Sequence, residues 1–415
     1  MFENVLYQEA TNFLKSDIEQ GKLPQALLFA GPPCSGKLTA AFEIARILSC
    51  TANPRGEWQC TCPSCIKHKN LVSTDLLIVG TRSCTPEISA SRKTFLAALD
   101  KQENRLLTAR YLFIRSVRKL TNRFSQAVWE GDDKISKITP LVSLIDELTE
   151  EIDPGRPLPE KPELEKLTLK LEEQCIKLEN SFMYDSIPVA HIRKASAWAH
   201  YTLNTGKRVF IIENADSMQE SVRNALLKTL EEPPEQSVFI LTAQNRNAVM
   251  PTILSRVRTY AFKNRNFEQN MEVLTRIYHP NEEDIAKLTQ HSVAQGMSVL
   301  SAYLNSFLPV SPEVIIREAR TFMEHLNKNT LPDTESLLTQ LKNFEPRIIL
   351  KLFFNALFDI CREKIICDDT TSVAYNTQKA ERIAMAVKHA YTNITVYNQS
   401  PVAAIEKFTV FVLEG

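Results

Sequence analysis

Four short runs of consecutive apolar residues stand out in two separate parts of the chain. They occupy residues 26–30, 76–79, 209–212 and 238–241. Runs of this kind, without alternating polar positions, are typical of strands that are buried on both faces. Beside them, apolar residues recur every three or four positions, which predicts amphipathic helices. The predicted helices span residues 4–20, 38–49, 189–203 and 217–231. Buried strands that alternate with helices predict an α/β domain whose parallel sheet is covered on both faces.

Residues 84–186 separate the two α/β parts and have a different character. Two apolar stripes with steps of three, four and seven residues predict two helices there. The stripes comprise Leu106, Phe113, Val117, Leu120 and Phe124, and then Leu164, Leu167, Leu171, Cys175, Leu178 and Phe182. A loop rich in proline lies between them at 153–159. We predict a helical hairpin or a small helical bundle that is inserted into the α/β domain.

The two predicted helices of the insertion carry opposite charges. The basic residues of the first are Arg105, Arg110, Arg115, Arg118, Lys119 and Arg123, and the acidic residues of the second are Glu160, Glu163, Glu165, Glu172 and Glu173. Our interpretation is that these are two solvated faces that attract each other. An arm that binds DNA or a partner protein is the alternative.

From residue 266 to the end the pattern is helical, with no further strand-like run. Its long amphipathic stretches are 312–327, 334–366, 376–391 and 400–413. The whole pattern predicts an α/β domain in two parts, the insertion, a small helical domain and a larger helical domain. The predicted bounds are 1–83 and 187–263 for the α/β domain, 84–186 for the insertion, and 264–308 and 309–415 for the helical domains.

The charge balance of the chain limits the classes of function. With 49 Lys and Arg against 49 Asp and Glu, the formal net charge of the 415 residues is zero, which argues against a protein that coats DNA. No apolar run reaches the roughly 18 residues that a membrane span needs, and the N-terminal residues do not resemble a signal peptide. We therefore expect a cytoplasmic protein with no membrane partner and with reduced thiols.

A turn that contains two glycines follows the first predicted strand and opens a helix. It comprises Gly31, Pro32, Pro33, Cys34, Ser35, Gly36, Lys37 and Leu38, and Thr39 comes next. Strand, turn, lysine and helix in this order are typical of a phosphate-binding loop. The backbone N–H groups would surround a phosphate and Lys37 would supply a positive charge. ATP or ADP is the expected ligand, bound weakly, and we interpret Cys34 as an incidental small residue.

Two positions depart from what nucleotide hydrolysis requires. The residue after the lysine should carry a hydroxyl that binds Mg²⁺, but it is Leu38, and Thr39 lies about 100° further round the helix. The strand at 209–212 is followed by Glu213 and Asn214. A carboxylate is thus kept at the first of these positions, but the amide at the second cannot act as a general base. We therefore expect the chain's own ATPase activity to be weak or absent.

Four of the nine cysteines are clustered just after the helix of the phosphate-binding loop. They are Cys50, Cys60, Cys62 and Cys65. Thiolates at this spacing suit a tetrahedral Zn²⁺ site, and ordinary cytosolic thiols are the alternative. Because four protein ligands would fill the coordination shell, we expect a structural zinc rather than a catalytic one.

These motifs, in this order, resemble the bacterial DNA polymerase III clamp-loader subunits of the AAA+ class, of the delta-prime and gamma/tau type. The resemblance rests on residues 23–29 before the phosphate-binding loop, on the cysteine cluster after it, and on residues 224–234 and 251–257. It is good over 1–80 and 187–262, loose over 263–415, and absent over 84–184. It implies an α/β AAA+ domain, an all-α lid at 264–308 and an all-α collar for oligomerisation at 309–415.

The resemblance also implies a set of partners. Family members form a five-subunit loader that opens the sliding clamp and places it on primed DNA. Its gamma/tau subunits hydrolyse ATP, whereas its delta-prime subunit has a degenerate nucleotide site and works beside subunits of the gamma/tau and delta types. Leu38, Asn214 and Ala243 favour the delta-prime type, as does the lack of a phosphate-sensing arginine at 295–299.

Arg256 belongs to the sequence Ser255-Arg256-Val257, which matches the family's Ser-Arg-Cys motif except at its last residue. In the family this arginine reaches into the neighbouring subunit's ATP site. The resemblance therefore implies that Arg256 is an arginine finger that acts in trans.

For the function of the whole chain, one alternative is an active ATPase of the gamma/tau type. Another is a phosphotransferase with a zinc-stapled lid, which leaves Arg256 unexplained.

Overall fold

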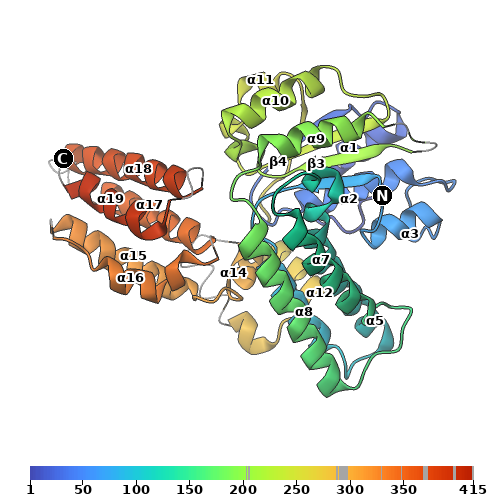
Figure 1. Ribbon diagram of the computed structural model, residues 1–415, viewed down its shortest axis with the longest axis horizontal. Coiled ribbons are helices and arrows are strands. Elements are labelled where there is room, and N and C mark those ends of the chain that lie inside the picture. The colour runs from blue at the N-terminus through green and yellow to red at the C-terminus, as the bar shows by residue number, and fades with distance from the viewer. Residues whose placement is uncertain are drawn as a thin grey trace. The chain divides into compact units, whose positions relative to one another are not determined.

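The computed structural model divides into two compact units, Met1–Leu304 and Asn305–Gly415 (Figure 1). It describes all residues except 202, 204–205, 287, 289–297, 329, 347, 368–372, 396–398 and 414–415. Residues 295–297, where the sequence lacks a phosphate-sensing arginine, lie outside the described residues. The finer division into five segments stays a prediction.

The first unit contains the predicted parallel sheet. Its five strands lie in the order β2-β3-β4-β1-β5, and all of the pairs are parallel. The strands are β1 (Ala26–Ala30), β2 (Leu76–Val79), β3 (Arg208–Ile212), β4 (Ser237–Ala243) and β5 (Arg258–Ala261). Because all strands run the same way, the segments that follow β1, β2 and β3 meet at one edge of the sheet. This edge carries the phosphate-binding loop and Glu213.

Strand β5 was not among the predicted strands. Only Tyr260 of its four residues is buried, so it forms no apolar run that could be recognised in the sequence. It pairs with β1, with Ala30 opposite Ala261. The four strands that do consist of apolar runs were all predicted within two residues of their observed ends.

Two hydrophobic cores lie on the two faces of the sheet. Leu27 and Phe29 of β1 point to the face that is covered by α1 (Ala10–Glu19) and α2 (Lys37–Ser49). Leu28 points to the opposite face, which is covered by α9 (Val189–Ala199), α10 (Glu220–Glu231) and the inserted helices. This alternation accounts for the unbroken apolar runs, because both faces of each central strand are buried.

The insertion is a bundle of helices rather than a simple hairpin. Its helices are α4 (Thr85–Ala97), α5 (Glu103–Thr121), α6 (Gln126–Trp129), α7 (Ile135–Glu150) and α8 (Lys161–Phe182). Figure 1 shows α5, α7 and α8 grouped beside the α/β part. The two predicted apolar stripes lie on α5 and α8, and Phe113 and Leu171 are fully buried in the shared core.

The charged faces of α5 and α8 do not pair as expected. Arg115 and Arg118 of α5 donate to the backbone carbonyls of Lys69 and Asn70 in the α/β part. Lys119 pairs with Glu87, and Arg123 pairs with Glu213. Glu172 of α8 instead pairs with Arg92 of α4. The expectation of two mutually attracting solvated faces is therefore wrong, since Arg115, Arg118 and Arg123 bind the insertion to the α/β part.

Other helices of the first unit include α3 (Pro63–Lys69), α11 (Pro251–Leu254), α12 (Phe267–Tyr278) and α14 (Val299–Asn305). The second unit contains α15 (Pro312–Asn327), α16 (Thr334–Gln340), α17 (Ile348–Cys367), α18 (Val373–Thr395) and α19 (Pro401–Leu413). The predicted continuous stretch 334–366 is broken by a turn at Lys342–Phe344, whose residues have positive φ. Phe322, Phe353 and Phe408 are central in the core of this unit. None of the described helices is both long enough and apolar enough to cross a membrane.

Candidate functional site

The phosphate-binding loop connects β1 directly to α2, as predicted. Gly31 passes so close to the end of β5 that a Cβ atom there would lie 2.1 Å from the carbonyl oxygen of Phe262. Gly36 has a φ of +95°, which a glycine adopts without strain. The two glycines thus permit a tight turn between the sheet and the N-terminus of α2, where backbone N–H groups favour an anion.

Lys37 is turned toward its own loop. Its Nζ atom donates to the carbonyl oxygens of Gly31 and Pro32, at 2.5 Å each. Burial lowers the pKa of Lys37 to about 8. A phosphate bound in the loop would compete with these two carbonyl oxygens for the ammonium group.

Arg265 holds the outer side of the loop, a role that the sequence did not reveal. Arg265 follows β5 in the chain and is only 8% exposed. It donates to the carbonyl oxygens of Cys34 at 2.8 Å and Ser35 at 3.1 Å, and also to that of Leu6. Ser301 of α14 donates to the Sγ atom of Cys34 at 3.4 Å. The loop is therefore fixed by segments that are more than 200 residues away in the sequence.

Replacing this arginine should destabilise the first unit. In Arg265→Met three carbonyl groups lose their donor, which should lower the free energy of unfolding by about 3 kcal/mol. Urea unfolding followed by circular dichroism measures the loss, with Arg276→Met as a control because Arg276 is exposed on the neighbouring helix α12. A loss below about 1 kcal/mol, the value of an ordinary hydrogen bond, would contradict this role for Arg265.

The residues that should hold Mg²⁺ do not fit that ion. Leu38 packs against the hydrophobic core beside the loop and offers no ligand atom. Glu213 is held in a buried ion pair with Arg123. The side-chain amide of Asn214 donates to Thr81, and Ala243 is buried without any polar group. Thr39 is partly buried in the first turn of α2. Leu38 and Ala243 therefore offer no ligand atom for Mg²⁺, and the carboxylate of Glu213 is engaged by Arg123.

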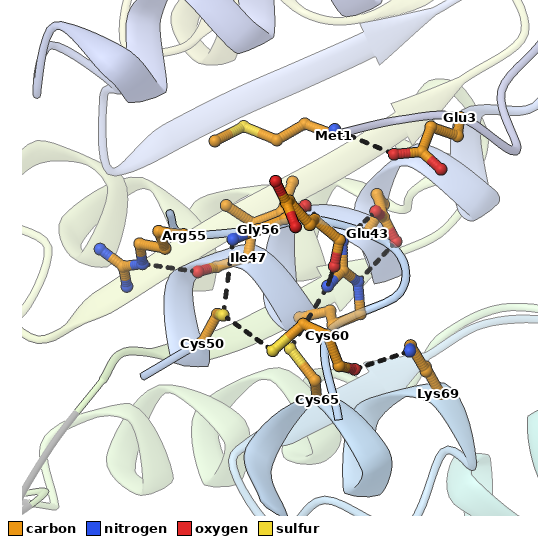
Figure 2. Close-up of polar contacts among 12 residues, drawn as sticks. Met1, Glu3, Glu43, Ile47, Cys50, Arg55, Gly56, Cys60, Cys65 and Lys69 are labelled. Atoms are coloured by element: carbon orange, nitrogen blue, oxygen red, sulfur yellow. Dashed lines mark hydrogen bonds and ion pairs between the residues drawn. The ribbon is translucent and has the colours of Figure 1, made fainter. Parts of the chain in front are cut away.

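The four clustered cysteines come together as predicted. Their Sγ atoms all lie within 4.8 Å of one another. Cys50 and Cys65 are buried, whereas Cys60 and Cys62 are partly exposed. Figure 2 shows Cys50, Cys60 and Cys65 with their sulfur atoms turned toward one another, between the end of α2 and α3. Four thiolate ligands at such mutual distances fit a tetrahedral zinc ion with no open position.

Hydrogen bonds around the cluster favour the thiolate form of Cys62, whereas burial raises the pKa of Cys65. The backbone N–H groups of Gly56, Cys62 and Cys65 point at the sulfurs of Cys50, Cys60 and Cys62 respectively, at 3.4–3.5 Å. Burial raises the pKa of Cys62, but hydrogen bonds from the backbone of Thr51 and Cys65 outweigh it and lower the pKa to about 5. Outer hydrogen bonds of this kind orient the ligands of a metal site.

A buried arginine completes the cysteine cluster. Arg46 of α2 is 1% exposed and donates to the Sγ atom of Cys65 at 3.3 Å and to the carbonyl oxygens of Gly56 and Glu57. Glu43 pairs with the same guanidinium. In Figure 2 the cluster also includes Lys69, which donates to the carbonyl oxygen of Cys60. Arg46 lies four residues before Cys50 and belongs to no recognisable motif. The sequence alone therefore could not assign it a role at the cysteine cluster.

Arg256 lies apart from the loop of its own chain, at the end of α11. Its Nε atom donates to Glu231 at 2.9 Å, and its Nη1 atom donates to the carbonyl oxygen of Thr252 at 2.7 Å. The side chain is 29% exposed. Arg256 is thus partly exposed, and its guanidinium is engaged by Glu231 and Thr252 of the same chain.

The family model described as DNA polymerase III, delta subunit, matches residues 7–151 and 162–266. The gamma/tau subunit of DNA polymerase III from Mycoplasma genitalium is 35% identical over 107 residues, 24% of this chain and 18% of that protein. The delta-prime subunit from Haemophilus influenzae is 33% identical over 89 residues, 19% of this chain and 27% of that protein. These matches span less than a third of either relative.

A gamma-subunit-related protein of DNA polymerase III from Thermotoga maritima has a solved structure that aligns with 60% of this chain and 90% of its own. The two chains share 17% identity, with a TM-score of 0.30. The family model covers well over half of the chain and includes both halves of the α/β part and most of the insertion. The chain therefore belongs to the DNA polymerase III delta-subunit family, and it is similar in part to gamma/tau and delta-prime subunits.

Proposed function

We propose that this chain is the non-motor, delta-prime-type subunit of a DNA polymerase III clamp loader. It helps to load the sliding clamp on primed DNA and donates Arg256 to the ATP site of a neighbouring subunit. The observation that carries the proposal is the contrast between the two sites. The chain's own site has lost the Mg²⁺-binding hydroxyl at Leu38 and the general base at Asn214, whereas Arg256 keeps a partly exposed side chain. An arginine finger acts in trans, so it remains useful when its owner cannot hydrolyse ATP.

The proposed partners are gamma/tau-type and delta-type subunits, the clamp and primed DNA, in the cytoplasm. The helices of the second unit are the proposed collar. Exposed apolar side chains on α19, among them Val402, Val410 and Phe411, support a role in subunit contacts. Structural zinc at the four cysteines and weakly bound ATP or ADP at residues 31–39 complete the proposal.

A gamma/tau-type ATPase is the second candidate. It is favoured by the retained Lys37 and by the 35% identity to a gamma/tau subunit over 107 residues. Leu38 and the ion pair of Glu213 argue against it, because both remove ligands of Mg²⁺. Family membership gives no support to the phosphotransferase alternative.

Reconstitution tests the proposal directly. The full chain is mixed with the other loader subunits, clamp and primed DNA, and clamp loading and ATP hydrolysis are measured with and without it. We expect that the isolated chain does not hydrolyse ATP, that it joins the complex, and that the complex requires it for clamp loading. Turnover by the isolated chain that Lys37→Ala abolishes would favour the gamma/tau alternative. Failure to form any complex would contradict both candidates.

A further inference from the structure

The carboxylate of Glu213 points away from the phosphate-binding loop. Glu213 follows β3, which lies between β2 and β4, and the loop follows β1 on the far side of β4. A Cβ atom built on Gly80, the residue after β2, would lie 1.9 Å from Oε2 of Glu213. The carboxylate therefore occupies the space above β2, on the side of β3 that is opposite to the loop.

Arg123 of the insertion meets the carboxylate there. Its Nε and Nη2 atoms donate to Oε2 of Glu213 at 3.0 Å and 2.6 Å. The Arg123 side chain is 4% exposed and that of Glu213 is 13% exposed. The guanidinium is itself held, because its Nη1 atom donates to the carbonyl oxygen of Lys119. The backbone of Arg123 is also held, because Trp129 donates to its carbonyl oxygen at 2.7 Å.

Gly80 is the third member of this arrangement. A side chain at this position would collide with the carboxylate and would also lie 3.0 Å from Nε of Arg123. The pair thus depends on a glycine at the end of β2, on an acid at the end of β3 and on an arginine just beyond α5. A buried carboxylate with this partner has its charge balanced before any metal ion arrives, so a cation would have to displace a positioned guanidinium.

We propose that Arg123 is a built-in counter-ion that holds Glu213 away from the phosphate-binding loop, so that the insertion itself keeps this loop from using a divalent cation. The contact is autoinhibitory, because Arg123 occupies the carboxylate of Glu213 that could otherwise interact with a divalent cation. It concerns the isolated chain and does not depend on which role the chain has in the loader.

The affinity of the full chain for labelled ATP, measured by equilibrium dialysis in Mn²⁺ and in EDTA, tests this inference. In the unchanged chain we expect the two affinities to agree within about twofold. In Arg123→Gln the freed carboxylate should make ATP binding about tenfold tighter in Mn²⁺ than in EDTA, the usual size of an outer-shell contribution. Arg123→Gln combined with Glu213→Gln should lose that gain. Arg105→Gln, an exposed arginine on α5, is the matched control and should behave as the unchanged chain.

Folding is measured beside binding, because removal of Arg123 leaves a buried carboxylate without its partner. Urea unfolding should show a lower midpoint for Arg123→Gln than for the double variant, in which neither charge remains. If Arg123→Gln does not fold, Gly80→Ala provides the second test. Its methyl group displaces the carboxylate while both charges stay in the chain, and it should produce the same dependence on Mn²⁺.

Two results would overturn the inference. One is an unchanged chain whose ATP affinity is already about tenfold higher in Mn²⁺ and loses this gain in Glu213→Gln. The other is a folded Arg123→Gln or Gly80→Ala variant in which Mn²⁺ produces no gain. Either result would leave the proposed loader role intact, because that role is tested by assembly and clamp loading.

Discussion

Removing the metal from the four-cysteine site should disorder the segment between Cys50 and Lys69 and loosen α2. Structural zinc contributes directly to folding, by about 10–16 kcal/mol in isolated zinc-finger peptides. Here the cluster is linked to α2 through Arg46, which binds the Sγ atom of Cys65 and the carbonyl oxygens of the intervening loop. Because α2 begins at Lys37, loss of the metal should also reach the phosphate-binding loop.

Metal analysis and hydrogen exchange together check this expectation. The purified chain should contain one zinc ion, and Cys65→Ser should contain none. Treatment with a strong chelator should increase amide exchange in α3 and in the last turns of α2. Cys34→Ser removes a thiol outside the cluster and should keep the metal. A purified chain that lacks metal and does not change its exchange with added zinc would show that the cysteines are ordinary thiols.

The insertion is bound to the α/β part by buried and partly buried basic side chains. Deletion of residues 84–184 would be a natural test for binding of DNA, but it would remove Arg123 and leave Glu213 buried without its counter-ion. The side chains of Arg115 and Arg118 are engaged with carbonyl oxygens of the α/β part. Deletion would thus combine a loss of stability with any loss of affinity, whereas single charge variants keep the two effects apart.

Local patterns in the sequence predicted the helices and strands of this chain better than they predicted the contacts between them. The four apolar strands were found because burial on both faces leaves a run that no other element explains. Strand β5 was missed, since it lies at the sheet edge with only Tyr260 buried. The four cysteines were found because metal ligation fixes residue type and spacing together.

Two of the residues that the sequence did not reveal are buried arginines with distant partners. Arg123 pairs with Glu213 across 90 positions, and Arg265 binds Cys34 across 231 positions. A basic residue on an amphipathic helix has the same local pattern whether it faces solvent or a carboxylate far along the chain. For this reason α5 was interpreted as a solvated basic face, although most of its charges are engaged inside the molecule.

Replacing Arg256 should have the largest effect on the assembled loader. An arginine finger stabilises the charge that develops on the transferred phosphoryl group, and its loss lowers turnover at the affected site by about 10³-fold or more. We therefore expect Arg256→Ala to abolish DNA-stimulated ATP hydrolysis at one neighbouring site, whereas Lys37→Ala in the same chain should have little effect. Arg258→Ala is the matched control, because Arg258 lies two positions away and pairs with Asp17 of its own chain.

The ion pair with Glu231 makes this prediction specific. Before Arg256 can reach a neighbouring phosphate it must leave Glu231, but the pair is exposed and such pairs contribute only about 0–1 kcal/mol. Glu231→Gln should therefore change the assembled rate by about fivefold or less, in contrast to Arg256→Ala. Sedimentation of each complex shows whether the subunits still assemble. An intact Arg256→Ala complex with an unchanged rate would mean that Arg256 serves its own chain, as the partner of Glu231 and Thr252.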